Sequence, residues 1–420
     1  MRGATVAILL AAAASVTGPA AGRAPPIPAP RDARAWAAAE AYRPEQLRTL
    51  QSIVNVDSGT GDVAGGSKVA SLLIPQLKAL GMDVRTVAAE APDLPDNIVA
   101  TLNGTGRGRI LMIGHIDTVF GPGTVAQRPF RVAGGHATGP GVSDEKGGVV
   151  EGLYALRILH DLGFRDFGRI TFLIETSEER GSPGTQALIK RLVGEADVEL
   201  NLEPGDPPDV LTVWRKGSTT YHIDVKGRAA HAGVAPQDGR NAAVELIHQI
   251  QADDVFPHSG DGLTANLTLM KAGSRENIIP DTASAAINVR VRDKADFDRV
   301  RRTYEANAQH SQVPDTEVVV SSTPAFPPLA NNVGTDGVAV RAEAIYEGIG
   351  RSIGLGGNGG ASESALAYEA GVPALDGLGP VGGGFHSDQE YLDLATLTPR
   401  LYLLAELLMD LGRNPPPRLK

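Results

Sequence analysis

The chain has 420 residues, no cysteine and a formal net charge of −10, from 39 Lys and Arg against 49 Asp and Glu. This length predicts two or three domains, and the 42% of hydrophobic residues is enough for a large core. The acidic balance argues against nucleic acid or an anionic membrane as the main partner. Without cysteine, disulfides, thiolate metal sites and a cysteine nucleophile are excluded, so catalysis must use histidine, carboxylates, serine or a metal held by nitrogen and oxygen.

Residues 1–22 have the pattern of a secretory signal peptide. Arg2 precedes an apolar stretch over residues 4–16, and small residues follow that stretch. The stretch is too short for a membrane span. We therefore expect cleavage near residues 20–23, a Pro/Ala-rich leader over 23–35, and a secreted, periplasmic protein without a membrane anchor. An Ala-rich disordered leader is the alternative interpretation.

Helices and strands alternate in the first half of the chain. Apolar spacing predicts helices over 45–56, 68–80 and 145–162, and strands over 83–87, 97–102, 110–113 and 170–174. This pattern predicts an α/β fold with a mainly parallel sheet. The alternation of helices and strands resumes after residues 326–328. Thr398 followed by Pro399 predicts the cap and the first residue of a final helix.

The pattern changes from about Trp214 onwards. Its order is strand 219–225, helix 241–251, strands 264–271 and 283–291, helix 295–308 and strand 316–321. This β-α-β-β-α-β order is typical of a ferredoxin-like α+β domain. We therefore predict a catalytic domain formed by 36–213 and 327–420, with an inserted domain over 214–326.

Polar residues follow the predicted strands of the larger domain. His115 and Asp117 leave strand 110–113 on the same side, and a carboxylate beside a histidine can fix its tautomer as a metal ligand. Taken alone, such a pair at a strand end is more often a satisfied polar turn than a functional site. Asp144 lies in a glycine-rich turn before helix 145–162, where helix capping is the alternative.

Three further acids and a histidine occupy similar places. Glu178 and Glu179 follow strand 170–174, and adjacent carboxylates repel each other unless positive charge is near, although a solvated loop is the alternative. Glu203 follows an apolar run, and His386 ends a glycine-rich loop. Two histidines and several carboxylates at strand ends suit a pair of divalent ions such as zinc.

These motifs together resemble those of the M20 metallopeptidases, and they are most similar to the glutamate carboxypeptidase branch. The motifs occur in the family's order, as His115-x-Asp117, Gly-Pro-Gly-x-x-Asp144-x-Lys-Gly-Gly, Glu178-Glu179, Glu203-Pro204 and His386-Ser-Asp. The resemblance extends from about residue 54 to the end of the chain. It implies a zinc-peptidase fold with an inserted lid or dimerisation domain, in agreement with the order of elements.

The resemblance also implies a metal centre with two Zn²⁺ ions per subunit. In the family's arrangement, Asp144 bridges the two ions. His115 and Glu203 complete the ligands of one ion, and Glu179 and His386 complete those of the other.

Other roles follow from the same resemblance. Asp117 would orient His115, and Glu178 would be the general base that takes a proton from the attacking water and passes it to the leaving amine. His231 resembles the family's lid histidine, which stabilises the oxyanion from its own subunit or across a dimer, although a turn histidine is the alternative. Asn277 and Arg290 resemble positions that hold a substrate carboxylate, although Arg290 could instead pair with a surface acid.

The resulting hypothesis is a secreted zinc exopeptidase that acts on N-acylated or N-blocked amino acids as a homodimer. It would hydrolyse their amide bond and release a C-terminal residue such as glutamate. Residues 357–360, together with Ala361-Ser362-Glu363, occupy the place of a substrate loop in the family. Relatives often have Asp near the position of Glu363, which leaves the side-chain preference open. An aminoacylase, a deacylase or a dipeptidase of the same chemistry is the first alternative, and a non-catalytic binding protein on this scaffold is the second.

Overall fold

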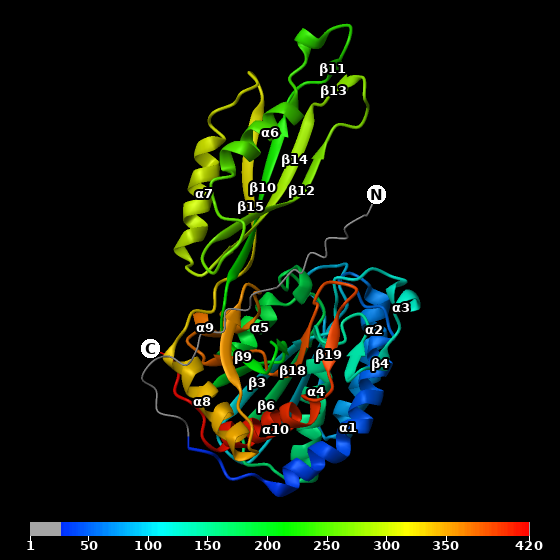
Figure 1. Ribbon diagram of the computed structural model, residues 1–420, viewed down its shortest axis with the longest axis vertical. Helices are drawn as coiled ribbons and strands as arrows, with labels where there is room; N and C mark the ends of the chain where they lie inside the picture. The colour runs from blue at the N-terminus through cyan, green and yellow to red at the C-terminus, as the bar shows by residue number, and fades with distance from the viewer. Residues whose placement is uncertain (1–26, 420) are drawn as a thin grey trace, which may run out of the picture.

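A computed structural model describes residues 27–419, so the predicted signal peptide lies outside the described residues. Figure 1 shows a larger part below, which contains both ends of the described chain, and an elongated smaller part above it. Within the described residues, no helix has both the length and the apolarity needed to cross a membrane.

The larger part is built on a six-stranded sheet with the order β1-β2-β6-β3-β7-β17. Its strands are β1 (Asp83–Val87), β2 (Asn97–Asn103), β3 (Arg109–His115), β6 (Arg169–Glu175), β7 (Val198–Asn201) and β17 (Ala374–Leu375). Strands β6, β3, β7 and β17 are parallel, whereas β1 pairs with β2 and β2 with β6 in antiparallel fashion. The α/β prediction is confirmed, but the sheet is mixed. Parallel neighbours need a long crossover, usually a helix, and the loop 88–96 between β1 and β2 has none.

Helices cover this sheet, and α4 lies at the centre of the largest core. The helices are α1 (Ala33–Val54), α2 (Val63–Ala79), α3 (Thr124–Gln127), α4 (Lys146–Asp161), α5 (Gln186–Gly194), α8 (Val333–Gly348), α9 (Ser364–Glu369) and α10 (Leu397–Arg413). Helix α10 packs on α1, α4 and α8. The start predicted for α10 was two residues late, since Thr398 and Pro399 lie in its first turn, where proline leaves no hydrogen bond unmade.

Two smaller sheets complete the larger part. One has the order β4-β5-β19-β18-β8, and in the other β16 pairs with β9 in parallel. Their strands are β4 (Arg131–Ala133), β5 (His136–Thr138), β8 (Pro204–Gly205), β9 (Val210–Arg215), β16 (Gly354–Asn358), β18 (Gly379–Gly383) and β19 (Tyr391–Asp393). These short strands bring the loops around Asp144, Glu203 and His386 to one edge of the main sheet.

The smaller part contains the predicted β-α-β-β-α-β order. Its main elements are β10 (Gly217–Lys226), α6 (Ala242–Asp253), β12 (Thr264–Ala272), β14 (Thr282–Val291), α7 (Ala295–Asn307) and β15 (Glu317–Phe326). The strands form an antiparallel sheet with the order β12-β14-β10-β15, and a separate core includes Tyr221, Leu246 and Tyr304. Two short strands, β11 (Ala230–His231) and β13 (Ile278–Ile279), lie at the far end (Figure 1). A lid or dimerisation role for this part stays a prediction.

Candidate metal centre and active site

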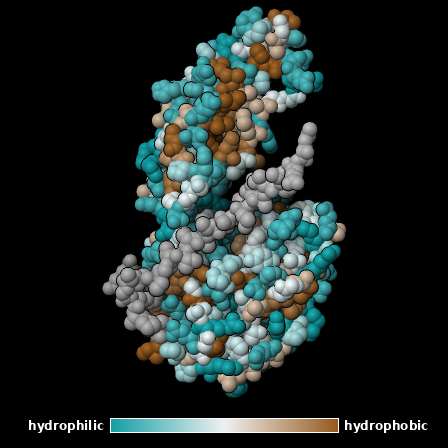
Figure 2. Space-filling model, in the orientation of Figure 1, coloured by the Kyte–Doolittle hydropathy of each residue, from teal (hydrophilic) through white to brown (hydrophobic). Residues whose placement is uncertain are grey.

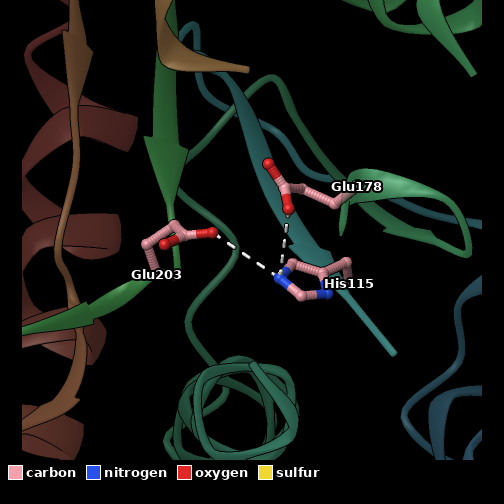
Figure 3. A group of neighbouring side chains, drawn as sticks. All are labelled: His115, Glu178 and Glu203. Carbon is pink, nitrogen blue, oxygen red and sulfur yellow. Dashed lines mark ion pairs between the residues drawn. The ribbon is translucent and has the colours of Figure 1, made fainter. Parts of the chain in front are cut away.

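His115 ends strand β3, and its two ring nitrogens have different surroundings. Nδ1 lies 3.0 Å from the carbonyl oxygen of Asp117 and 3.4 Å from its Oδ1. Nε2 faces the carboxylates of Glu203 and Glu178 at 3.6 and 3.9 Å, as Figure 3 shows. Nε2 is buried and has no hydrogen-bond partner among the described residues. A buried imidazole nitrogen that is oriented through its other nitrogen and faces carboxylates fits a metal ligand.

Asp144 lies between this histidine and His386. Its Oδ1 is 3.3 Å from Nε2 of His115, and its Oδ2 is 3.3 Å from Nε2 of His386. Glu179 Oε2 approaches the same nitrogen of His386 at 3.0 Å. The ligand atoms form two groups within 4.8 Å, which are His115, Glu178 and Glu203, and Asp144, Glu179 and His386. The structure thus brings together the five predicted ligands and Glu178, and Asp144 does not cap α4, which begins at Lys146.

The clustered acids perturb one another and the two histidines. Burial raises the pKa of Glu178, and the carboxylate of Glu363 raises it further. Burial also raises the pKa of Glu203 to about 7, although Arg215 opposes this shift. Hydrogen bonds to Asp144 and Glu179 raise the pKa of His386 to about 10. A cluster that attracts protons in this way also attracts cations, which agrees with a site for divalent ions.

Asp117 contacts the backbone of the loop that carries Glu178 and Glu179, in addition to the His115 ring. Its Oδ1 accepts a hydrogen bond from the backbone N–H of Glu178 at 3.1 Å, and its Oδ2 accepts one from Glu179 at 3.3 Å. Oδ2 also accepts from the hydroxyl of Thr60 at 2.6 Å. Asp117 therefore positions the loop that carries Glu178 and Glu179, in addition to lying beside His115 as expected.

A cavity of about 470 Å³ lies beside these residues, and both parts of the chain line it. From the larger part come Asp144, Glu178, Glu179, Glu203 and His386, and from the smaller part come Ser218, Thr220, Asn288 and Arg290. Arg290 Nε donates to Asn288 Oδ1 at 2.8 Å, and its Nη1 lies 3.4 Å from the carbonyl oxygen of Gly359. Within residues 27–419 no carboxylate forms an ion pair with Arg290. The alternative interpretation, that Arg290 pairs with an acid on the surface, is therefore not supported.

The profile of the peptidase family M20/M25/M40 matches residues 111–410 of this chain. The chain belongs to the M20 peptidase family. It is similar to carboxypeptidase G2 of Pseudomonas sp. (strain RS-16), with 36% identity over 385 residues that cover 91% of this chain and 93% of that protein. The succinyl-diaminopimelate desuccinylase of Methylorubrum extorquens (strain PA1) is 29% identical and covers 84% of this chain and 94% of its own length.

Solved structures of other peptidases share the fold. A tripeptidase from Staphylococcus aureus has a TM-score of 0.71 at 23% identity, and covers 88% of this chain and 98% of its own. Human carnosine dipeptidase 1 has a TM-score of 0.71 at 17% identity, and covers 90% of this chain and 99% of its own. The M20 chain is therefore an enzyme of the metallopeptidase type, with carboxylate and histidine groups that fit a metal.

Two buried residues of this M20 site were missed from the sequence. Arg215 donates to Asp376 through Nε at 2.7 Å and Nη2 at 2.6 Å, and Nη2 also reaches Glu203 Oε2 at 3.2 Å. Glu145 accepts a hydrogen bond from the backbone of His115 at 3.1 Å. The sequence held one signal for each residue. Arg215 is a charged residue directly after the apolar run of β9, and Glu145 is an acid adjacent to Asp144.

The structure does not bring His231 and Asn277 to the metal centre of their own chain. Both are exposed and lie at the far end of the smaller part, where Ala232 N donates to the carbonyl oxygen of Asn277 at 3.0 Å (Figure 1). Neither lines the cavity, because β10 and β14 extend away from the larger part. Contact of these residues with a substrate in the cavity of their own chain is therefore not supported, and action of His231 across a dimer, which the resemblance left open, stays a prediction.

Glu363 also differs from the expectation that it lies in a substrate loop. Its side chain is buried, with Oε1 3.2 Å from the hydroxyl of Ser182 and Oε2 2.9 Å from Nδ2 of Asn201. Gly360 and Ala361 line the cavity, but Glu363 does not. Glu363 is thus a buried residue next to the site. Its side chain does not contact the cavity.

Proposed function

We propose that this M20 peptidase is a dizinc exopeptidase that hydrolyses the amide bond of N-acylated or N-blocked amino acids and releases a C-terminal residue such as glutamate. The observation that carries the proposal is the position of Asp144, whose two oxygens each lie 3.3 Å from a different histidine nitrogen. One carboxylate placed in this way can serve two ions. The 36% identity with carboxypeptidase G2 supports the glutamate-releasing type.

In this proposal His115 and Glu203 would hold one ion, Glu179 and His386 would hold the other, and Asp144 would serve both. Bound zinc would polarise the scissile carbonyl and lower the pKa of the attacking water. Glu178 takes the proton from that water and delivers it to the leaving amine. Burial raises the pKa of Glu178, and positive charge bound beside it would keep the carboxylate ionised, so that it can accept the proton.

The other wall of the cavity suits the C-terminal carboxylate of a substrate. Arg290 is half-buried there without a carboxylate partner among the described residues, and a guanidinium can bind a carboxylate at two points. Asn288, Ser218 and Thr220 add polar groups around it. Recognition of a free carboxylate close to Glu178 favours removal of the terminal residue over cleavage within a longer chain.

The test uses the chain without residues 1–22. We expect two zinc ions per chain by elemental analysis, and hydrolysis of folate-like, acyl-glutamate or dipeptide substrates that chelator abolishes and zinc restores. Glu178→Gln should retain zinc and lose activity by about 10²- to 10⁴-fold, because the general base is removed. The exposed Glu195→Gln serves as the control. Protein without stoichiometric metal, or a fully active Glu178→Gln variant, would contradict the proposal.

A deacylase or dipeptidase of the same chemistry is the second candidate. It is favoured by the similarity to a succinyl-diaminopimelate desuccinylase, at 29% identity. The same substrate panel separates the candidates, because a deacylase follows the acyl group and a carboxypeptidase follows the C-terminal residue. The presence of all five ligands and Glu178 argues against a non-catalytic binding protein.

Export and dimerisation are also part of the proposal. Residues 1–22 would direct export to the periplasm. The test is to fractionate cells that express the chain with and without these residues.

For the dimer, exposed apolar side chains support an interface on the smaller part, where Figure 2 shows them gathered along α6 and β12. They are Val244, Ile247, Leu267, Leu269 and Met270, which are 43–62% exposed. Strand β12 is also an edge strand, whose free backbone groups can pair with a second chain.

A further inference from the structure

The loop between β5 and α4 carries Asp144 and has no regular secondary structure of its own. Gly139 and Gly141 within it have positive φ angles of 149° and 72°. Three of its backbone N–H groups point to one acceptor, the carboxylate of Glu390. Gly141 donates to Oε2 at 2.9 Å, and Ser143 and Asp144 donate to Oε1 at 2.9 and 3.1 Å.

Glu390 belongs to the segment that carries the other histidine. It follows His386 by four residues and lies directly before β19 (Tyr391–Asp393). Its side chain is buried, with 1% exposure, and both oxygens are engaged by the loop amides. Hydrogen bonds from amides to an ionised carboxylate are stronger than those between neutral groups. Glu390 therefore ties together two loops that are 246 residues apart in the chain.

The ring of His386 is held only by Asp144 and by Glu179, whose Oε2 lies 3.0 Å from Nε2, among the described residues. Its side chain is 55% exposed, compared with 12% for Asp144. Its φ angle of 60° lies in the left-handed region, and the next residue is held by Ser387 N donating to the Gly384 carbonyl at 3.2 Å and by Arg128 Nη1 donating to the Ser387 carbonyl at 3.0 Å. The 3.3 Å approach of Asp144 to His386 therefore depends on how firmly the two loops are joined.

We propose that Glu390 is a positioning residue that holds the Asp144 loop against the His386 loop and so keeps Asp144, Glu179 and His386 in a geometry that binds a metal ion. This inference rests on the proposed dizinc function. Glu390 takes no part in the chemistry, because its oxygens are occupied by backbone N–H groups. Loss of groups that orient metal ligands typically weakens metal binding by about 10- to 100-fold.

Two variants separate the hydrogen bonds from the charge. Glu390→Gln keeps the shape, but its NH₂ group cannot accept from an amide, so at least one of the three bonds is lost. Glu390→Asp keeps the charge and withdraws the carboxylate by one methylene. The matched control is Asp393→Asn in the same segment, where the carboxylate accepts from Ala395 N at 2.9 Å and does not contact the Asp144 loop.

Metal-free protein is titrated with Zn²⁺ in competition with a chromophoric chelator, and its melting temperature is measured before zinc is added. We expect both Glu390 variants to lose about 10- to 100-fold in affinity for one of two ions, with the control unchanged and the metal-free melting temperatures within a few degrees of wild type. Equal affinities in wild type and variants would overturn this role alone. A metal-free melting temperature lower by on the order of 10 °C would also overturn it, since Glu390 would then stabilise the fold as a whole. A wild type that takes up no zinc would remove the proposed function as well.

Discussion

Arg290 is the residue at which the two parts of the chain meet in the cavity. It comes from β14 of the smaller part, and its guanidinium approaches the carbonyl oxygen of Gly359 in the larger part at 3.4 Å. Desolvation lowers the pKa of Arg290, while the nearby charge of Glu178 opposes that shift. A partly desolvated cation without an ion-pair partner is stabilised strongly when an anionic ligand binds to it.

Replacing this guanidinium should separate substrate binding from chemistry. For Arg290→Met we expect a KM about 10- to 100-fold higher for substrates with a free C-terminal carboxylate, because charge-assisted hydrogen bonds are lost. The corresponding C-terminal amides should react with both proteins at similar rates. Steady-state kinetics on the acid and amide pair is the measurement, and Arg299→Met, on the exposed surface of α7, is the control. Equal losses for acids and amides would exclude carboxylate recognition by Arg290.

Sequence reasoning worked best for residues that belong to short motifs. The proposed ligands His115, Asp144 and Glu179 were identified because each lies in a recognisable motif after a strand or in a glycine-rich loop, and the structure brings them together. Arg215 and Glu390 were missed because their contacts involve residues far away in the chain, 161 positions for Asp376 and 246 for Asp144. The motif around His231 left open the subunit in which it acts, since a local motif does not show how far a strand carries a residue from the cavity of its own chain.

The first turns of helix α4 pack closely against the chain that precedes Glu203. A Cβ atom on Gly148 would lie only 1.9 Å from the carbonyl oxygen of Leu202. Gly148 is therefore required for the close approach of the helix to this strand end. Sequence patterns predicted the helices α2, α4, α6, α7 and α10, the second half of α1, and the strands β1, β2, β3, β6, β10, β12, β14 and β15, but they missed α3, α5, α8, α9 and most of the short strands. They also did not show that β1 and β2 run antiparallel to their neighbours, because spacing along one strand does not determine the direction of the next.

Alanine substitutions in two helices should have opposite effects. Gly148→Ala should lower the free energy of unfolding by roughly 1–3 kcal/mol, because the backbone must shift to relieve the clash. Gly337→Ala in α8 has open space around its Cβ and should raise that free energy by about 0.5–1 kcal/mol through helix propensity. Denaturant unfolding of the metal-free proteins measures both. A stabilised Gly148→Ala protein would show that α4 and the Leu202 segment can separate without cost.

The larger and the smaller part of the chain have separate hydrophobic cores. The core of the smaller part contains residues from Tyr221 to Tyr304, and none of them belongs to the two cores of the larger part. The exposed apolar strip on α6 and β12 lies on this smaller part, away from the cavity. A second copy bound at this strip would leave each metal centre unobstructed while placing His231 on a surface that a partner chain can approach.

A lysine in the strip should therefore disrupt the proposed dimer. Leu269, which is 62% exposed on β12, is the best position, and we expect Leu269→Lys to be a monomer by light scattering, since a charge cannot be buried there without a partner. Val333→Lys is the matched control, because Val333 is 83% exposed on the larger part, and it should remain a dimer. If His231 acts across the dimer, the Leu269 variant also loses activity. A Leu269→Lys protein that is still a dimer would exclude this strip as the interface.

The smaller part is attached to the larger one through two chain passages that pair with each other, with Ser218 opposite Phe326 in strands β10 and β15. Its entry and exit therefore lie side by side, as the two ends of a hairpin do. The intervening segment could be replaced by a short turn without separating β9 from the chain that follows β15. The larger part is thus interrupted at one point only, and a change of the smaller part would alter one wall of the cavity while leaving the chain path of the larger part intact.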